Sequence, residues 1–138
     1  MGGKTGTGEL PKHLQRNLEG IVDDFIICPV RNMAEDEDIL IKGYISELES
    51  AGRKVHYPPR DTNQNDAVGL NICTENKNAI KKAGEVHIYY NSKSTGTVFD
   101  LGMAFMARKP LVIINQEFNY EEQDKIFGFV VNYAEKID

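Results

Sequence analysis

The 138-residue chain is long enough for one domain with its own core, and its hydrophobic content of 41% and charged content of 27% are ordinary for a soluble globular protein. A net charge of −5 excludes a dominant basic face, so we expect no nucleic-acid partner. Because no apolar run could span a membrane and the N-terminus has no signal-peptide core, we expect a cytoplasmic protein with no membrane partner.

The first 22 residues are predicted to lie outside the main domain. The opening MGGKTGTG is glycine-rich, which favours a flexible tail, and its GKT lacks the strand that precedes a P-loop. Apolar residues then recur at the spacing of a short amphipathic helix: Leu10, Leu14, Leu18 and Ile21. We therefore divide the chain into residues 1–22, a tail and helix, and residues 23–138, a single domain.

The remaining chain alternates between short apolar runs and longer amphipathic runs. The predicted strands span residues 23–30, 55–57, 86–90 and 110–115. The predicted helices span residues 34–52, 70–85, 97–109 and most of 119–137, where 127–133 could instead form an edge strand. This alternation predicts a three-layer, doubly wound α/β fold of the flavodoxin or Rossmann kind, with a mostly parallel sheet and helices on both faces.

Ligands of such folds bind beyond the carboxyl ends of the strands, which makes the loop after Tyr90 a candidate site. In NSKSTGTVFDLGMAF, either Ser94 or Thr97 can cap the helix that follows, and the free N–H groups at its start can bind a phosphate. Asp100 follows in an apolar stretch that faces the mouth of the sheet, so it is a candidate nucleophile or general base. An ordinary capped helix would use the same hydroxyls, and the motif alone leaves both interpretations open.

Two further loops follow predicted strands. In CPVRN, Cys28 could be a nucleophile, although a small buried thiol is the more common role, and Asn32 could cap a helix or contact a ligand. In YPPRDTNQND, Asn63 and Gln64 carry amides that can read a base edge, although a solvated loop has the same composition. The three histidines show no metal-ligand spacing, so we expect neither a metal nor a cofactor.

Together these loops resemble the nucleoside 2-deoxyribosyltransferase superfamily, which includes base-exchanging transferases and nucleoside 5′-monophosphate N-glycosidases. The resemblance runs from Phe25 to Asn115. It rests on FIICPVRN as first strand and loop, PPRDTNQ as the base-side loop, ENKNAIKKAGEV as the helix into the third strand, and STGTVFDLGMAFMARKPLVII. The last piece is similar to the family pattern G-T-x-x-E-L-G-x-A followed by K-P-V.

The resemblance implies cleavage or exchange of an N-glycosidic bond in a nucleoside or nucleoside 5′-monophosphate. Asp100 stands where the family has its catalytic Glu, and Asn76 aligns with a second family acid, usually Asp. Ser94 resembles the serine that the monophosphate N-glycosidases place beside the 5′-phosphate. The resemblance also implies a homo-oligomer whose neighbouring chain completes each pocket. The implied substrate-binding residues are Phe25, Cys28, Pro29, Asn32, Arg60, Asp61, Asn63, Gln64, Ser92, Ser94, Gly96 and Thr97.

Two departures from the family pattern keep a second function open. The Asp100 side chain is one methylene shorter than Glu, and Asn76 cannot donate a proton as a carboxylic acid does. A non-catalytic nucleotide-binding or sensor module would carry the same replacements. In an enzyme, attack by water on the sugar intermediate would make a hydrolase, and attack by a second base would make a transferase.

Overall fold

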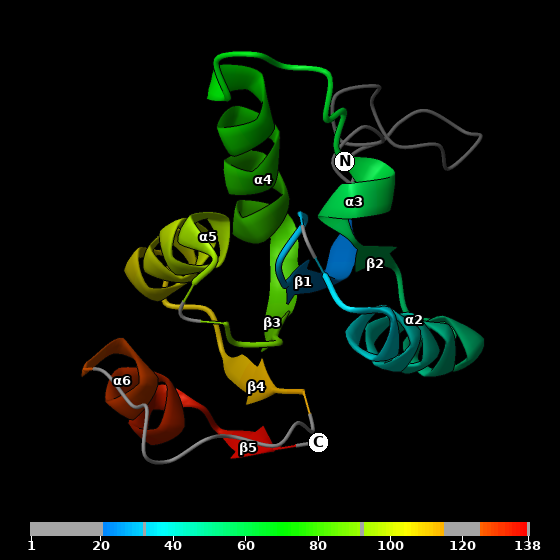
Figure 1. Cartoon of the computed structure of the whole chain (residues 1–138). Helices are drawn as coiled ribbons and strands as arrows, with labels where there is room; N and C mark the ends of the chain where they lie inside the picture. The colour runs from blue at the N-terminus through cyan, green and yellow to red at the C-terminus, as the bar shows by residue number, and fades with distance from the viewer. Residues whose placement is uncertain (1–20, 32, 92, 115–124, 138) are drawn as a thin grey trace, which may run out of the picture.

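The computed structural model describes residues 21–31, 33–91, 93–114 and 125–137, and confirms the predicted α/β fold (Figure 1). Five strands form one sheet in the order β2-β1-β3-β4-β5, and each neighbouring pair is parallel. The strands are β1 (Val22–Ile27), β2 (Val55–His56), β3 (Ala83–Ile88), β4 (Leu111–Ile113) and β5 (Lys136–Ile137). No helix among the described residues is long and apolar enough to cross a membrane.

Helices cover both faces of this sheet, as Figure 1 shows. One face packs against α2, and the other packs against α4, α5 and α6. The short helix α3 follows β2 directly. The helices are α2 (Glu35–Ser50), α3 (Pro58–Asp61), α4 (Leu70–Lys82), α5 (Thr95–Met106) and α6 (Lys125–Tyr133).

Strand β1 and the residue after it contribute side chains to the cores on both faces of the sheet. Successive side chains of a strand point to opposite faces of the sheet. Phe25 and Ile27 accordingly join the core under α4, α5 and α6, while Ile26 and Cys28 join the core under α2. Because all four are buried, the segment from Phe25 to Cys28 reads in the sequence as an unbroken apolar run rather than an alternating one.

Several element boundaries differ from the sequence predictions. The first strand begins at Val22, one residue inside the predicted N-terminal segment, and the third begins at Ala83, which pairs with Val22. Residues 127–133 lie in α6, so the edge-strand alternative is wrong, and the last strand is β5 instead. The predicted tail and helix fall, up to residue 20, outside the described residues.

Helix α3 was not expected from the sequence, because two consecutive prolines favour a loop. Proline is nevertheless well suited to the first helical position, where its missing N–H has no intrahelical partner. Pro58 occupies that position, and the N–H of Thr62 closes the single turn on the Pro58 carbonyl at 3.1 Å. The turn directs the chain from β2 toward α4.

Candidate active site

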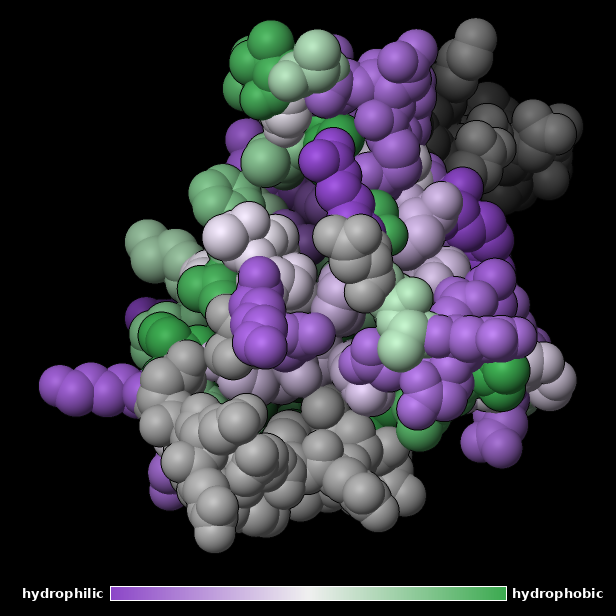
Figure 2. Space-filling view, viewed as in Figure 1, coloured by the Kyte–Doolittle hydropathy of each residue, from purple (hydrophilic) through white to green (hydrophobic). Residues whose placement is uncertain are grey.

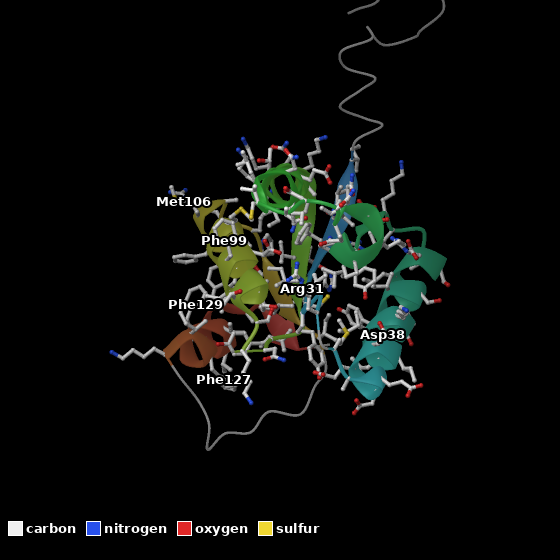
Figure 3. The ribbon with its side chains drawn as sticks, turned by 45° about the horizontal axis from the view of Figure 1, so that its top comes forward. Arg31, Asp38, Phe99, Met106, Phe127 and Phe129 are labelled. Atoms are coloured by element: carbon white, nitrogen blue, oxygen red, sulfur yellow. The ribbon has the colours of Figure 1, made fainter. Side chains whose placement is uncertain are left out.

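The carboxyl ends of β1, β2 and β3 lie along one edge of the sheet, because these strands are parallel neighbours. The three candidate loops start there, as the topology predicts. In the view of Figure 3, Arg31 from the loop after β1 lies between the ribbons of α5 and α2. The polar side chains described below come from the ends of these strands and from α4 and α5.

Asp100 is a buried carboxyl group on α5, with 9% of its surface exposed. Burial raises its pKa from the ordinary 3.8 to about 7, and a hydrogen bond from Asn76 opposes this rise. The helix begins at Thr95, two residues earlier than predicted, so Asp100 lies in the second turn rather than the first. Loss of water, rather than the helix dipole, therefore dominates its electrostatics.

Asn76, on α4, is the hydrogen-bond partner of that carboxyl group. Its Nδ2 donates to Asp100 Oδ2 at 3.4 Å, which is a long hydrogen bond. Its Oδ1 accepts from the hydroxyl of Thr62 at 2.8 Å. Asn76 is 5% exposed and Thr62 is 3% exposed, so both groups must find their partners within the protein.

The contacts continue beyond Thr62 to His56, which the sequence did not single out, and to Phe25. His56 Nε2 lies 2.8 Å from Thr62 Oγ1. The His56 ring stacks on Phe25, with centroids 5.3 Å apart and planes 7° from parallel. Phe25 has no exposed surface. It therefore supports the His56 ring and presents no surface to a ligand. With Phe25 included, five segments thus supply one connected row of side chains that ends at Asp100.

Cys28 lies close enough to Asp100 for the charge of that carboxylate to affect it. Burial raises the pKa of Cys28 to about 12, and the negative charges of Asp100 and Asp38 contribute to the rise. A thiol held in its neutral form is a poor nucleophile. Cys28 is therefore a buried, uncharged side chain near Asp100. The adjacent Pro29 is also buried.

Ser94 caps the N-terminus of α5, which decides between the two capping residues that the sequence left open. Its Oγ accepts from the backbone N–H of Thr97 at 3.2 Å and from the Thr97 hydroxyl at 2.9 Å. Because both of these contacts use Ser94 as acceptor, its own proton can be donated to an anion. The N–H groups of Thr95 and Gly96 have no intrahelical partner by position and can do the same.

Two charged residues of the base-side loop, Arg60 and Asp61, bond to each other and to nearby protein groups. Arg60 contacts both carboxylate oxygens of Asp61, at 2.8 and 2.9 Å, and also reaches Glu49 at 3.2 Å. Asp61 accepts from the N–H of Tyr57 at 2.8 Å. These contacts turn Arg60 and Asp61 toward α2 and toward their own loop.

The two amides of this loop differ in what they leave free. Gln64 Nε2 donates to the carbonyls of Pro58 at 2.9 Å and Thr62 at 3.3 Å, so its carbonyl oxygen is the group available to a ligand. Asn63 is exposed and accepts from the N–H of Asn65 at 3.0 Å. Two further predicted contacts, Asn32 and Ser92, lie outside the described residues.

Two hollows open on the surface of the described residues. The larger, about 880 Å³, lies between α2 and α3, and Arg60 and Glu49 are among its lining residues. The smaller, about 600 Å³, is an apolar hollow over α4 and α5. Neither hollow is lined by Asp100 or Asn76. The buried carboxyl group with its directed amide, rather than hollow size, marks the candidate site.

A second polar cluster lies on the α2 face of the sheet. Asp24, Glu85 and His87 each present one ligand atom within 4.8 Å of the others, which is a spacing that a metal ion could use. Arg53, however, donates to both oxygens of Asp24 at 2.6 Å, and His87 Nε2 lies 2.9 Å from Asp24 and from Glu85. The buried carboxylate is thus neutralised by protein groups, and we assign this cluster a structural role.

The sequence matches no protein-family model and no curated protein. Solved structures do match. A 2-deoxyribosyltransferase from Bacillus psychrosaccharolyticus has a TM-score of 0.66 and 15% identity, over 85% of each chain. The CMP N-glycosidase of Clostridium botulinum has a TM-score of 0.57 and 20% identity, over 84% of this chain and 88% of that one.

The chain has the fold of these two enzymes. Both belong to the nucleoside 2-deoxyribosyltransferase superfamily, so the resemblance of the sequence motifs extends to the three-dimensional structure. At such low identity the match establishes the fold, and function must be argued from the site.

Proposed function

We propose that the protein cleaves or exchanges the N-glycosidic bond of a nucleoside or nucleoside 5′-monophosphate, with Asp100 as the nucleophile. One observation carries the proposal: a buried carboxyl group with a pKa of about 7 sits beside a capped helix start, at the edge where this fold binds ligands. The fold shared with a 2-deoxyribosyltransferase and a CMP N-glycosidase supports the same chemistry.

The chemistry needs the ionised form of Asp100. A carboxylate oxygen attacks the anomeric carbon, the bond from carbon to nitrogen breaks, and its electron pair leaves with the base. The product is a neutral glycosyl ester. Because burial disfavours the charged carboxylate, forming a neutral ester relieves that penalty as the reaction proceeds. Attack on the ester by water then releases the sugar, whereas attack by a second base forms a new nucleoside.

The leaving base receives no proton from Asn76, since an amide is not an acid at neutral pH. We therefore propose that the base departs with its electron pair and takes a proton from solvent. We expect the rate to rise with the ability of the base to carry negative charge. The lack of an acid at this position is also what favours the second candidate function, a nucleotide-binding sensor that performs no chemistry.

The 5′ side of the substrate is assigned to the start of α5. The Ser94 hydroxyl and the N–H groups of Thr95 and Gly96 together offer donors to a phosphate. Thr97 is fully buried and holds Ser94 in place. Asn63 and Gln64 are assigned to the base, the latter through its free carbonyl oxygen.

We further propose a homo-oligomer, supported by the apolar outer face of α5. Phe99, Phe105 and Met106 are 53%, 52% and 85% exposed, and Phe99 and Met106 line the hollow over α4 and α5. Figure 2 shows apolar residues gathered over α5 and the start of α4, and Figure 3 shows Phe99 and Met106 pointing away from the sheet. Large adjoining apolar groups on a surface commonly mark a contact with another chain.

The function is tested by incubating the protein with a panel of nucleosides and nucleoside 5′-monophosphates, with and without a second free base. Base released or exchanged is measured by chromatography. Release from monophosphates alone would support a phosphate at Ser94, and formation of a new nucleoside would support a transferase. If no base appears while a nucleotide still raises the melting temperature, the sensor function replaces the enzyme.

A further inference from the structure

His56 and Thr62 belong to no assigned part of the site, yet they lie in an unbroken row with Asn76 and Asp100. The row runs from His56 Nε2 to Thr62 Oγ1 at 2.8 Å, from Thr62 to Asn76 Oδ1 at 2.8 Å, and from Asn76 Nδ2 to Asp100 Oδ2 at 3.4 Å. We infer that His56 and Thr62 are positioning residues, which hold the amide of Asn76 with its N–H toward the nucleophile. The inference rests on the proposed function, and it adds the two residues that hold Asn76 in place.

The direction of each hydrogen bond follows from counting protons. Thr62 has one hydroxyl proton, and it goes to Asn76 Oδ1. Toward His56, Thr62 can then act only as acceptor, so His56 must carry a proton on Nε2. Since Oδ1 of Asn76 is held by Thr62, the Nδ2 donor of the same amide is left facing Asp100.

This direction matters because an amide can be turned over. With the amide of Asn76 reversed, its carbonyl oxygen would face Asp100, and two acceptors would meet unless the carboxyl group carried a proton. Only the observed orientation provides a donor for an ionised nucleophile. Thr62 therefore biases Asp100 toward the form that attacks a sugar.

The surroundings of His56 suit this role. Burial lowers the pKa of His56, and the negative charges of Asp61 and Glu75 offset that effect only in part, while Arg60 adds to it. The ring is thus neutral at neutral pH and can still donate from Nε2. Its stacking on Phe25 fixes the plane of the ring and hence the direction of that donor. The thiol of Cys28, which lies within reach of the Asp100 charge, stays neutral and adds no charge.

Titration of the Asp100 carboxyl carbon, followed by ¹³C NMR and assigned with Asp100→Asn, tests the inference directly. In Thr62→Val the titration midpoint should rise by about one pH unit, the size expected when a carboxylate loses a directed donor. Thr62→Ser should restore the wild-type midpoint. Thr74→Val is the matched control, because Thr74 lies on α4 and donates its hydroxyl to Leu70 instead. An unchanged midpoint in Thr62→Val would overturn the inference.

A measurement on the unmodified protein covers the case in which Thr62→Val does not fold. The ¹⁵N shifts of His56 should show a proton on Nε2, and a neutral ring protonated only on Nδ1 would refute the row as described. If base is released, the acid limb of kcat/KM should move with the carboxyl midpoint in Thr62→Val. Neither NMR measurement needs turnover. If the protein releases no base, the proposed function is refuted, and the two NMR measurements still decide whether His56 and Thr62 hold Asn76.

Discussion

Replacing Asp100 by Asn should stabilise the protein against unfolding, and this gain should grow as the pH rises. Burial raises the pKa of Asp100 above its unfolded value, so its contribution to stability is full below the unfolded pKa of 3.8 and is lost as the pH rises through about 7. Asn has no charge to bury at any of these pH values. The same substitution removes the nucleophile, so stability should rise while turnover disappears.

The linkage relation gives the magnitude. A single group with pKa values of 3.8 unfolded and about 7 folded loses roughly 2 to 3 kcal/mol of stability between pH 5 and pH 8. The free energy of unfolding of Asp100→Asn, relative to wild type, should increase by this amount over the same interval. Other titrating groups are common to both proteins and cancel in the comparison.

Urea unfolding of both proteins at pH 5, 6, 7 and 8 measures the difference. Glu47→Gln, at an exposed position on α2, corrects for the general effect of removing one negative charge. If Asp100→Asn gains nothing beyond that control between pH 5 and pH 8, the carboxyl group is not desolvated. Ester formation at Asp100 would then relieve no burial penalty, and this support for Asp100 as the nucleophile would be lost.

Three further predictions concern the cap, the ion pair between Arg53 and buried Asp24, and the outer face of α5. Ser94→Ala should lower the free energy of unfolding by about 1 kcal/mol through loss of the cap, and should weaken the binding of a nucleoside monophosphate more than that of its nucleoside in calorimetric titration. Arg53→Met should cost about 2 kcal/mol at pH 7, because the buried Asp24 carboxylate loses both hydrogen bonds from Arg53 and keeps its contact with His87. Burial alone would raise the pKa of Asp24, but hydrogen bonds from Arg53 and His87 outweigh it, so the Arg53→Met deficit in urea unfolding should shrink as the pH falls below 3.8. Met106→Glu should reduce the mass measured by light scattering, and an unchanged mass would exclude this face from any oligomer contact.

The layered fold could be predicted from the sequence because its strands are buried on both faces. An unbroken apolar run such as Phe25 to Cys28, set among amphipathic helical segments, is typical of a strand in a parallel sheet covered by helices. Boundaries were less predictable, since they depend on which polar group caps a helix. Ser94 rather than Thr97 caps α5, and that choice alone moves Asp100 from the first turn to the second.

The pairing of Asp100 with Asn76 was implied only by the family resemblance, and the fold brings the two side chains within hydrogen-bonding distance. The roles of His56 and Thr62 could not be predicted, because no spacing in the sequence relates them to Asn76. Their contacts exist because β2, the loop after α3 and α4 converge at one edge of the sheet. A histidine inside the predicted strand of residues 55–57 was the one available signal.

The most direct test of the central claim compares base release by wild type and Asp100→Ala at matched occupancy. A substrate found in the panel is added at concentrations that saturate each protein, as judged by its effect on melting temperature. Wild type should release base, Asp100→Ala should bind and release none, and Asp100→Glu should release base faster if the short side chain limits the rate. Equal release by wild type and Asp100→Ala would contradict the assignment of Asp100 as the nucleophile.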